Sequence, residues 1–515
     1  MAGMRALDMH GARRGVSWGR STRRWSRAKV AGAVVALAGM VGGPLALAGG
    51  AAASTYDPST DPYSMAAVTA NTGATSLWNA GFTGRGVDVA LIDTGVSPVA
   101  GLNGAGKIVN GPDLSLESQA KNLTHLDTNG HGTFMAGLIA GHDATLTAPY
   151  ASAPASAYRG MAPDARIVSV KVGDADGGTD VSQVIAGIDW VVQHAHDPGF
   201  NIRVINLSYG TNSTQAASVD PLSFAVERAW NAGIVVVVAA GNTGYQRGDG
   251  APGLADPAYN PFVIGVGGYD TVGTAAFNDD QMGSYSASST GCGSCKNPDF
   301  VAVGSHLQGL RVPNSYIDAN HPEGLLGTRY FRGSGTSEAT AIATGTIAMI
   351  LQEYPSLTPD QVKRFIADNG QKVPGADDQA QGGGEISLAN MAQKTPQTYT
   401  QNFTASTGTG TLEGARGTDH LTANGVVLTG EKDIFGHAFN ATTMATAETA
   451  GSSWTGGAWN GSTWSGSSWS GSSWSGSSWS GSTWSGSSWS GSSWSGSSWS
   501  GSSWSGGSWA TSTWT

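Results

Sequence analysis

The stretch from about Gly84 to Asn369 alternates short β-branched runs with longer segments of helical character, separated by Gly, Asn, Asp and Pro. Such alternation is typical of a parallel sheet flanked by helices. The apolar runs are nearly continuous, as buried parallel strands must be. We therefore expect an α/β fold with strands at 87–92, 166–172, 203–208, 234–240 and 262–267 and helices at 131–141, 181–195, 221–232, 337–353 and 359–368.

The distribution of charge points to export. The formal net charge of −10 argues against a nucleic-acid partner, because phosphate binding depends on clustered Lys and Arg. The densest basic cluster lies in the first 29 residues, and an uncharged run ending in small residues follows it, which is the order of a secretory signal. The run is also long enough to anchor the chain in a bilayer, but its glycines and Pro44 disfavour a permanent helix. We expect a signal peptide and a secreted, extracellular or cell-surface protein.

The C-terminal region has a low-complexity repeat. From Trp454 to Trp514 a Trp recurs every five residues, thirteen in all, on an uncharged background that is essentially SSWSG. A period of five matches neither a helix nor a strand, so we do not expect a normal core. Two interpretations stay open: a tether whose indoles stack on cell-wall or polysaccharide surfaces, and a flexible tail prone to self-association.

The chain has two cysteines, Cys292 and Cys295, in the segment GCGSCKNPD. Exported chains meet oxidising conditions, so we favour a disulfide that closes this small loop. A redox site is the weaker alternative, because the pair does not open a strand-to-helix turn. A metal site would need partners that the sequence does not identify.

Three residues could together form a nucleophilic centre. A Ser hydroxyl needs a His to take its proton and a carboxylate to orient that His. Asp93 ends an apolar strand, His131 stands between two glycines at a helix start, and Ser337 follows a Gly-rich turn at a helix N-terminus, where free N–H groups suit an oxyanion. Each alone also fits a structural role, as a turn residue, a core histidine or an N-cap. Their combination favours catalysis.

The motifs DTG, GHGT and GTS occur once each, in the order Asp, His, Ser, and resemble those of the subtilase family of serine proteases. A fourth segment, VVVVAAGNTG, resembles the family's oxyanion segment, so that Asn242 would donate its amide to the oxyanion rather than serve only as a turn residue. The resemblance covers roughly 70–394. It implies a three-layer subtilisin-like fold and an endopeptidase that hydrolyses protein or peptide substrates through an acyl-enzyme.

The resemblance extends to the cleft. The segment NLSYG is similar to the family's substrate-pairing segment, which implies that Ser208, Tyr209 and Gly210 bind substrate backbone by strand addition. Calcium is common in the family, but no ligand set can be assigned here residue by residue, and we name no metal ligand and no certain cofactor.

Departures from the family pattern leave an alternative function open. Glu338 stands where the family usually has Met, and would either favour basic substrate residues or face solvent at a helix N-terminus. Phe134 replaces a second His that is common in the family. A non-catalytic surface scaffold is therefore the main rival interpretation. An esterase of the α/β-hydrolase type would need Gly-x-Ser-x-Gly with the His last, and neither feature is present.

The sequence thus predicts five segments. They are a signal peptide at 1–53, an N-terminal arm at 54–83, a subtilisin-like peptidase domain at 84–394, a linker or small β-rich segment at 395–450, and the Trp/Ser/Gly repeat tail at 451–515.

Overall fold

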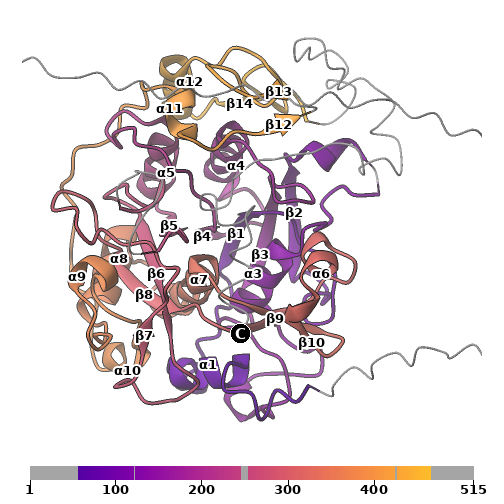
Figure 1. Ribbon diagram of the computed structural model, residues 1–515, viewed down its shortest axis with the longest axis vertical. Coiled ribbons are helices and arrows are strands. Elements are labelled where there is room, and N and C mark those ends of the chain that lie inside the picture. Colours follow the sequence, from indigo (N-terminus) through magenta and orange to yellow (C-terminus); the bar gives the residue numbers. More distant parts are fainter. Residues whose placement is uncertain (1–55, 121, 245–252, 424–425, 465–515) are drawn as a thin grey trace, which may run out of the picture. The chain divides into compact units, whose positions relative to one another are not determined.

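An eight-stranded sheet lies at the centre of the computed structural model, which describes residues 56–120, 122–244, 253–423 and 426–464 (Figure 1). The predicted signal peptide and most of the repeat tail lie outside these residues. The strand order is β2-β3-β1-β4-β5-β6-β7, with β8 paired to β6, and only the β6–β7 pairing is antiparallel. The strands are β1 (Asp88–Asp93), β2 (Ile108–Asp113), β3 (Arg166–Lys171), β4 (Ile202–Leu207), β5 (Val235–Ala239), β6 (Ile264–Asp270), β7 (Gln281–Met282) and β8 (Phe300–Val303).

Helices cover both faces of the sheet, which confirms the expected α/β class. On one side α3 (His131–Ala140) packs against α7 (Thr336–Glu353), and on the other α4 (Val181–His194) packs against α5 (Pro221–Asn231) (Figure 1). The other helices are α1 (Met65–Asn71), α2 (Ala74–Asn79), α6 (Tyr316–Asn320), α8 (Pro359–Asp368), α9 (Asp378–Gln381), α10 (Leu388–Met391), α11 (Leu412–Arg416) and α12 (Ala441–Thr449), with short 3₁₀ turns η1 (Leu116–Gln119), η2 (Tyr150–Ser152) and η3 (Pro322–Gly324).

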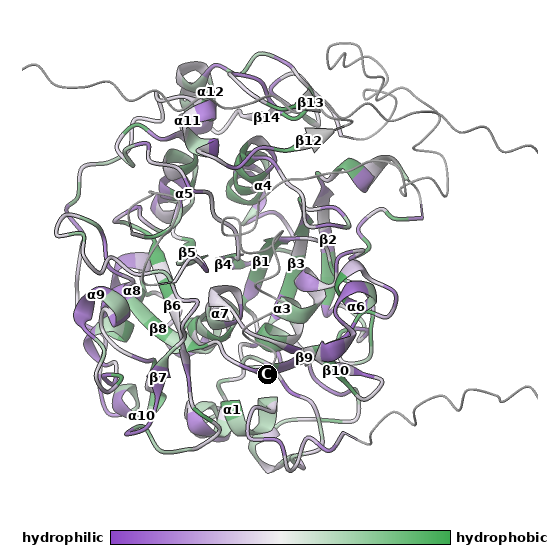
Figure 2. Ribbon diagram, in the orientation of Figure 1, coloured by the Kyte–Doolittle hydropathy of each residue, from purple (hydrophilic) through white to green (hydrophobic). Residues whose placement is uncertain are grey.

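Hydropathy and caps explain why these elements form. Every residue of β1 and β5 is buried, and Figure 2 shows the central strands as the most hydrophobic part of the fold, whereas peripheral helices such as α6 and α9 are hydrophilic. Asp180 and Gln183 form a capping box at the start of α4, and Thr358 and Gln361 form another at α8. Caps of this kind fix helix starts closely, and the predicted helix at 359–368 matches α8.

A second, antiparallel sheet was not expected from the sequence. It joins β9 (Leu307–Leu310), β10 (Leu325–Leu326) and β11 (Tyr330–Gly333) in the order β10-β11-β9, beside α3. These strands are too short to give a clear alternating pattern, and β2 was missed because its burial is mixed.

The segment that follows the predicted peptidase domain is a packed structure rather than a linker. It contains α11, α12 and the hairpins β12 (Thr422–Ala423)–β13 (Val426–Val427) and β14 (Trp454–Thr455)–β15 (Ala458–Trp459). Figure 1 shows it over α4 and α5, and α11, α12 and β14 contact these two helices. Residues 395–450, expected to be a linker or a small β-rich segment, are thus mainly helical in their regular structure, with one short hairpin.

The first three tryptophans of the repeat dock on the surface of the predicted peptidase domain. The indole N–H groups of Trp454, Trp459 and Trp464 donate to the carbonyl of Ala186, to Asp189 Oδ2 and to the carbonyl of Leu114, at 2.9, 2.7 and 2.7 Å. Trp459 is fully buried and Trp464 is 5% exposed, so the expectation that repeat tryptophans form no core is wrong for these residues. Hairpins and turns, rather than one continuous element, present the indoles, so the five-residue period does not prevent burial.

Within the described ranges, no helix is both long and apolar enough to cross a membrane.

Candidate active site

Asp93 lies at the carboxyl end of β1, fully buried, where sites on open α/β sheets gather. Its Oδ1 accepts a hydrogen bond from the backbone N–H of Thr94 at 2.8 Å and lies 2.7 Å from His131 Nδ1. Gly132 makes this approach feasible, because a β-carbon there would lie 2.2 Å from the carbonyl oxygen of Gly95. Of the two glycines that flank His131, Gly132 thus serves the Asp–His contact.

His131 is the first residue of α3, and a second carboxylate holds that helix start in place. Asp127 Oδ2 accepts hydrogen bonds from Thr133 N (2.8 Å) and Thr133 Oγ1 (2.6 Å), and its Oδ1 accepts from Gly130 N (2.7 Å) and Thr94 Oγ1 (2.9 Å). Asp127 therefore joins the first turn of α3 to the end of β1. The sequence analysis did not assign this residue, although an Asp just before a predicted helix start is a capping signal.

Ser337 is the second residue of α7 and is fully buried. Its Oγ makes no hydrogen bond with the residues that the structure describes, so the Ser–His hydrogen bond of a working triad is absent from this conformation. Catalytic hydrogen bonds are often long or misaligned without substrate. Ser208 Oγ, from the segment after β4, lies 3.5 Å from the carbonyl oxygen of Ser337.

Asn242 lies beside the start of α7 with its amide oriented. Its Oδ1 accepts hydrogen bonds from Thr336 N and Thr336 Oγ1, both at 2.8 Å. These two bonds fix the carbonyl end of the amide toward the helix, and Nδ2 is the donor end. Nδ2 would lie 3.2 Å from a β-carbon placed on Gly335, at the turn that leads into Ser337. The amide of Asn242 therefore lies beside the N-terminus of α7, and its role as an oxyanion donor stays a prediction.

Glu338 corrects the expectation of a solvent-facing or substrate-facing carboxylate, because its side chain is fully buried. Burial raises its pKa to about 7, although the charge of His131 acts in the opposite direction. Burial lowers the pKa of His131, but Asp93, and then Glu338 and Asp127, outweigh burial and bring that pKa above its ordinary value. The site therefore combines an imidazole with three acidic groups.

The predicted substrate-pairing residues lie next to this centre with buried side chains. Ser208 and Gly210 are buried, and Tyr209 is 1% exposed, with its phenol among Asp180, Asp256 and Asp419 rather than in the cleft. A β-carbon on Gly210 would lie 2.7 Å from Ala255 Cβ. Any contact of this segment with substrate would therefore come from its backbone.

Cys292 and Cys295 are joined by a disulfide, and the described residues include no free cysteine.

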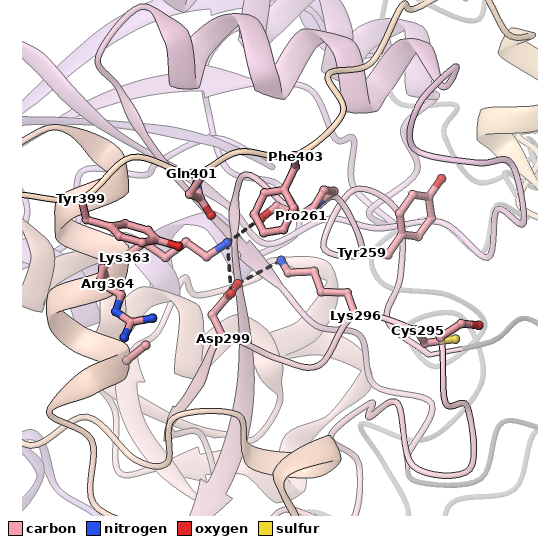
Figure 3. Close-up of a pocket in the computed structure, with 12 residues that line it drawn as sticks. Tyr259, Pro261, Cys295, Lys296, Asp299, Lys363, Arg364, Tyr399, Gln401 and Phe403 are labelled. Atoms are coloured by element: carbon pink, nitrogen blue, oxygen red, sulfur yellow. Dashed lines mark hydrogen bonds and ion pairs between the residues drawn. The ribbon is translucent and has the colours of Figure 1, made fainter.

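Cys295 lines a pocket of about 550 Å³ that none of the triad residues borders. Figure 3 shows Lys296 and Lys363 on either side of the Asp299 carboxylate, at 2.9 and 3.1 Å. Burial lowers the pKa of Lys296 to about 8 despite Asp299. Both ammonium groups also donate to backbone carbonyls, so they cross-link the fold around Asp299.

No cluster of three or more His, Cys, Asp or Glu side chains in the described part of the chain is arranged to hold a metal ion. The calcium that the resemblance implies finds no such side-chain set among these residues, and we derive no step through it.

The sequence of this chain is similar to those of known proteases. The family model described as "Subtilase family" matches residues 84–384. Serine protease AprX of Bacillus subtilis is 37% identical over 60% of this chain and 66% of its own length. A thermostable alkaline protease of Halalkalibacterium halodurans is 30% identical over 56% of this chain and 63% of its own. The matched region thus spans somewhat less than two thirds of either relative.

Solved structures resemble the chain as well. Fervidolysin from Fervidobacterium pennivorans, a keratinolytic enzyme related to subtilisin, has a TM-score of 0.49 at 22% identity over 64% of this chain and 46% of its own. A cold-adapted subtilisin-like serine proteinase has a TM-score of 0.42 at 30% identity over 59% of this chain and 88% of its own. Because the family model covers more than half of the sequence, the resemblance drawn from DTG, GHGT and GTS is confirmed, and the chain belongs to the subtilase family.

Proposed function

We propose that this chain is a secreted serine endopeptidase that hydrolyses peptide bonds through an acyl-enzyme. One observation carries the proposal: the buried contact of 2.7 Å between His131 Nδ1 and Asp93 Oδ1, at the end of β1. A carboxylate at this nitrogen keeps the proton on Nδ1, so that Nε2 is the basic nitrogen. The names of its relatives, serine protease AprX and a thermostable alkaline protease, support the same reaction class.

The mechanism assigns a role to each residue. Ser337 Oγ forms a bond to the peptide carbonyl carbon while His131 Nε2 takes the hydroxyl proton, and Asp93 holds the imidazolium. The oxyanion accepts hydrogen bonds from Asn242 Nδ2 and the backbone N–H of Ser337. The C–N bond then breaks as His131 gives its proton to the leaving amine. Water, deprotonated by His131, cleaves the ester and restores Ser337.

Substrate binding, in this proposal, depends on backbone groups of the protein. Because the side chains of Ser208 and Tyr209 are buried, we infer that residues 208–210 bind an extended peptide through N–H and C=O groups. The Oγ of Ser337 is not held by another described residue, so no hydrogen bond has to break before it turns toward a substrate.

Replacement of the nucleophile tests the proposal. We expect Ser337→Ala to lower kcat on casein or a peptide ester by about 10⁶-fold, the magnitude known for the nucleophile of subtilisin. Ser356→Ala, at an exposed position after α7, is the matched control and should keep full activity. A fluorophosphonate probe should label the wild type and Ser356→Ala but not Ser337→Ala. An unlabelled wild type that does not cleave peptides would favour the scaffold interpretation instead.

Export and the tail are part of the proposal. In the first 53 residues a basic segment is followed by an apolar one, which supports secretion, and N-terminal sequencing of the protein from culture medium tests it.

Contact of the repeat tail with cell wall or polysaccharide stays a prediction. Retention of the isolated repeat on cell wall, cellulose or chitin would support it, and its absence on all three would contradict it.

A further inference from the structure

Glu338, next to Ser337, is a buried carboxyl that has no hydrogen-bond partner in any other residue that the structure describes. Its side chain is fully buried in the first turn of α7, and neither carboxyl oxygen accepts a hydrogen bond from another described residue. A buried carboxylate in this state is costly unless a nearby positive charge compensates it. The proposed mechanism gives this carboxyl no role, so its burial requires an explanation.

The surrounding chain is shaped to accommodate this carboxyl. A β-carbon on Gly333 would lie 2.6 Å from Glu338 Oε1 and 2.8 Å from Phe134 Cζ, and one on Gly335 would lie 2.8 Å from Glu338 Oε2. Two glycines thus make room for the two oxygens, and the ring of Phe134 borders the same space. The apolar ring excludes water from this space, and burial favours the uncharged carboxyl.

The charged groups that act on Glu338 come from two neighbouring elements. His131 on α3 stabilises the carboxylate and Asp93 on β1 opposes it, while Asp127 acts in turn on His131. Among the described residues, His131 is the cation that acts on Glu338, and buried Lys171 of β3 donates instead to the carbonyl of Thr94 and pairs with Glu117. The charged groups on the neighbouring strands have partners of their own. Arg332 of β11 is paired with Asp61, and Arg203 of β4 donates to the carbonyls of Pro355 and Leu357. On β6, the phenol of Tyr269 interacts with Glu385, and Asp270 lies beside His306.

We propose that Glu338 is a positioning residue for the general base: its carboxylate acts through space on the imidazole of His131 and stabilises the protonated form of that imidazole. This inference rests on the proposed function only for its effect on catalysis. An ionised Glu338 stabilises the imidazolium, so His131 becomes a free base at a higher pH than Asp93 alone would require. A neutral side chain at position 338 removes this effect.

The pH dependence has a definite sign. Burial raises the pKa of Glu338 to about 7, the pKa of His131 lies above its ordinary value, and the charge of each group acts on the other. Activity requires neutral His131, so kcat/KM falls as the pH drops through the pKa of His131. With Glu338→Gln that pKa falls, and the acid limb of the profile moves to lower pH by about 0.5–1.5 units.

The first experiment does not depend on activity. The pKa of the His131 imidazole is measured by NMR titration in Ser337→Ala and in Ser337→Ala/Glu338→Gln, where autolysis is absent. We expect the second protein to have the lower pKa. An unchanged pKa overturns the inference, whether or not the wild type hydrolyses peptides, so failure of the proposed function can be recognised separately.

The second experiment compares kcat/KM profiles of active variants. Glu338→Gln should shift the acid limb to lower pH, Glu338→Asp should restore part of the difference by returning the charge, and Glu353→Gln, at the far end of α7, should match the wild type. If Glu338→Gln does not fold, Glu338→Asp and Glu338→Met replace it in the NMR titration. A merely structural role would lower kcat/KM equally at every pH, and that result would overturn the inference.

Discussion

Two buried regions of the molecule differ in whether their polar groups are hydrogen-bonded. At the start of α7, Ser337 Oγ and both carboxyl oxygens of Glu338 make no hydrogen bond with a described residue. Where the C-terminal segment meets α4, the indole N–H groups of Trp454 and Trp459 and the guanidinium of Arg416 are hydrogen-bonded. A buried polar group left unpaired costs about 1–3 kcal/mol. The unpaired groups of the first region therefore reduce stability, and the paired groups of the second region supply it.

Arg416 shows how the second region is held. Its side chain is fully buried, with Nε 2.6 Å from Asp180 Oδ2 and Nη2 3.2 Å from Asp180 Oδ1, in a bidentate pair. Asp180 also caps α4, so one carboxylate links the helix start to α11. Burial tends to raise the pKa of Asp180, but Arg416 and the Ser182 hydrogen bonds hold it below its ordinary value.

The largest expected effect is on stability in this second region. Arg416→Ala should lower the free energy of unfolding by about 3–5 kcal/mol, because it leaves the Asp180 charge buried without its partner. Denaturant unfolding in the Ser337→Ala background measures this without autolysis. Arg364→Ala is the matched control: its pair with Asp368 is about half exposed and should contribute at most about 1 kcal/mol. Equal losses from both variants would mean that the buried pair is not a main stabilising contact.

The next effect is on catalysis and should leave stability nearly intact. Asn242→Ala removes a donor to the oxyanion, so kcat should fall by about 10²–10³-fold, a magnitude known from subtilisin, equivalent to about 2.7–4 kcal/mol. The loss of the acceptor for Thr336 should cost only about 1 kcal/mol of unfolding free energy. Steady-state kinetics and unfolding curves of the same preparation separate the two. If Asn242→Ala lowers the free energy of unfolding but leaves kcat unchanged, Asn242 contributes to stability as the second region does and not to catalysis.

The sequence predicts the first region better than the second for a physical reason. Asp93, His131, Asn242 and Ser337 each lie at a junction between a strand or helix and a Gly-rich turn, and such junctions leave local patterns in the sequence. The starts of α4 and α8 were predictable in the same way, from an Asp or Thr followed three residues later by Gln. Local chemistry of this kind needs no knowledge of distant neighbours.

The burial of Glu338 and the docking of the tryptophans depend instead on distant partners. Glu338 is enclosed by Phe134, about 200 residues earlier, and by glycines whose spacing says nothing of a carboxyl. Trp454 docks on the backbone carbonyl of Ala186, an acceptor that every residue type has. A backbone acceptor leaves no trace in the sequence, so the repeat alone could not indicate which of its tryptophans are buried.

The smallest expected effect concerns Trp459, whose N–H donates to the buried carboxylate of Asp189 at 2.7 Å. Burial raises the pKa of Asp189 to about 7, while Trp459 and, more weakly, Arg228 favour the charged form, and Glu448 on α12 is a second buried acid beside it. Because this folded-state pKa lies above the unfolded value of about 3.9, ionisation of Asp189 destabilises the fold as the pH rises through this range.

Trp459→Phe keeps most of the ring and removes the donor, so the pKa of Asp189 should rise further. The variant should lose about 1–3 kcal/mol of unfolding free energy, with a larger loss at pH 8 than at pH 5. Trp454→Phe is the matched control, since its indole donates to a neutral carbonyl and its loss should be independent of pH. Unfolding curves of both variants between pH 5 and pH 8 test this expectation. If the loss of unfolding free energy has the same pH dependence in both variants, ionisation of Asp189 does not change the stability of the C-terminal segment. The two regions would then differ only in whether their buried polar groups are hydrogen-bonded.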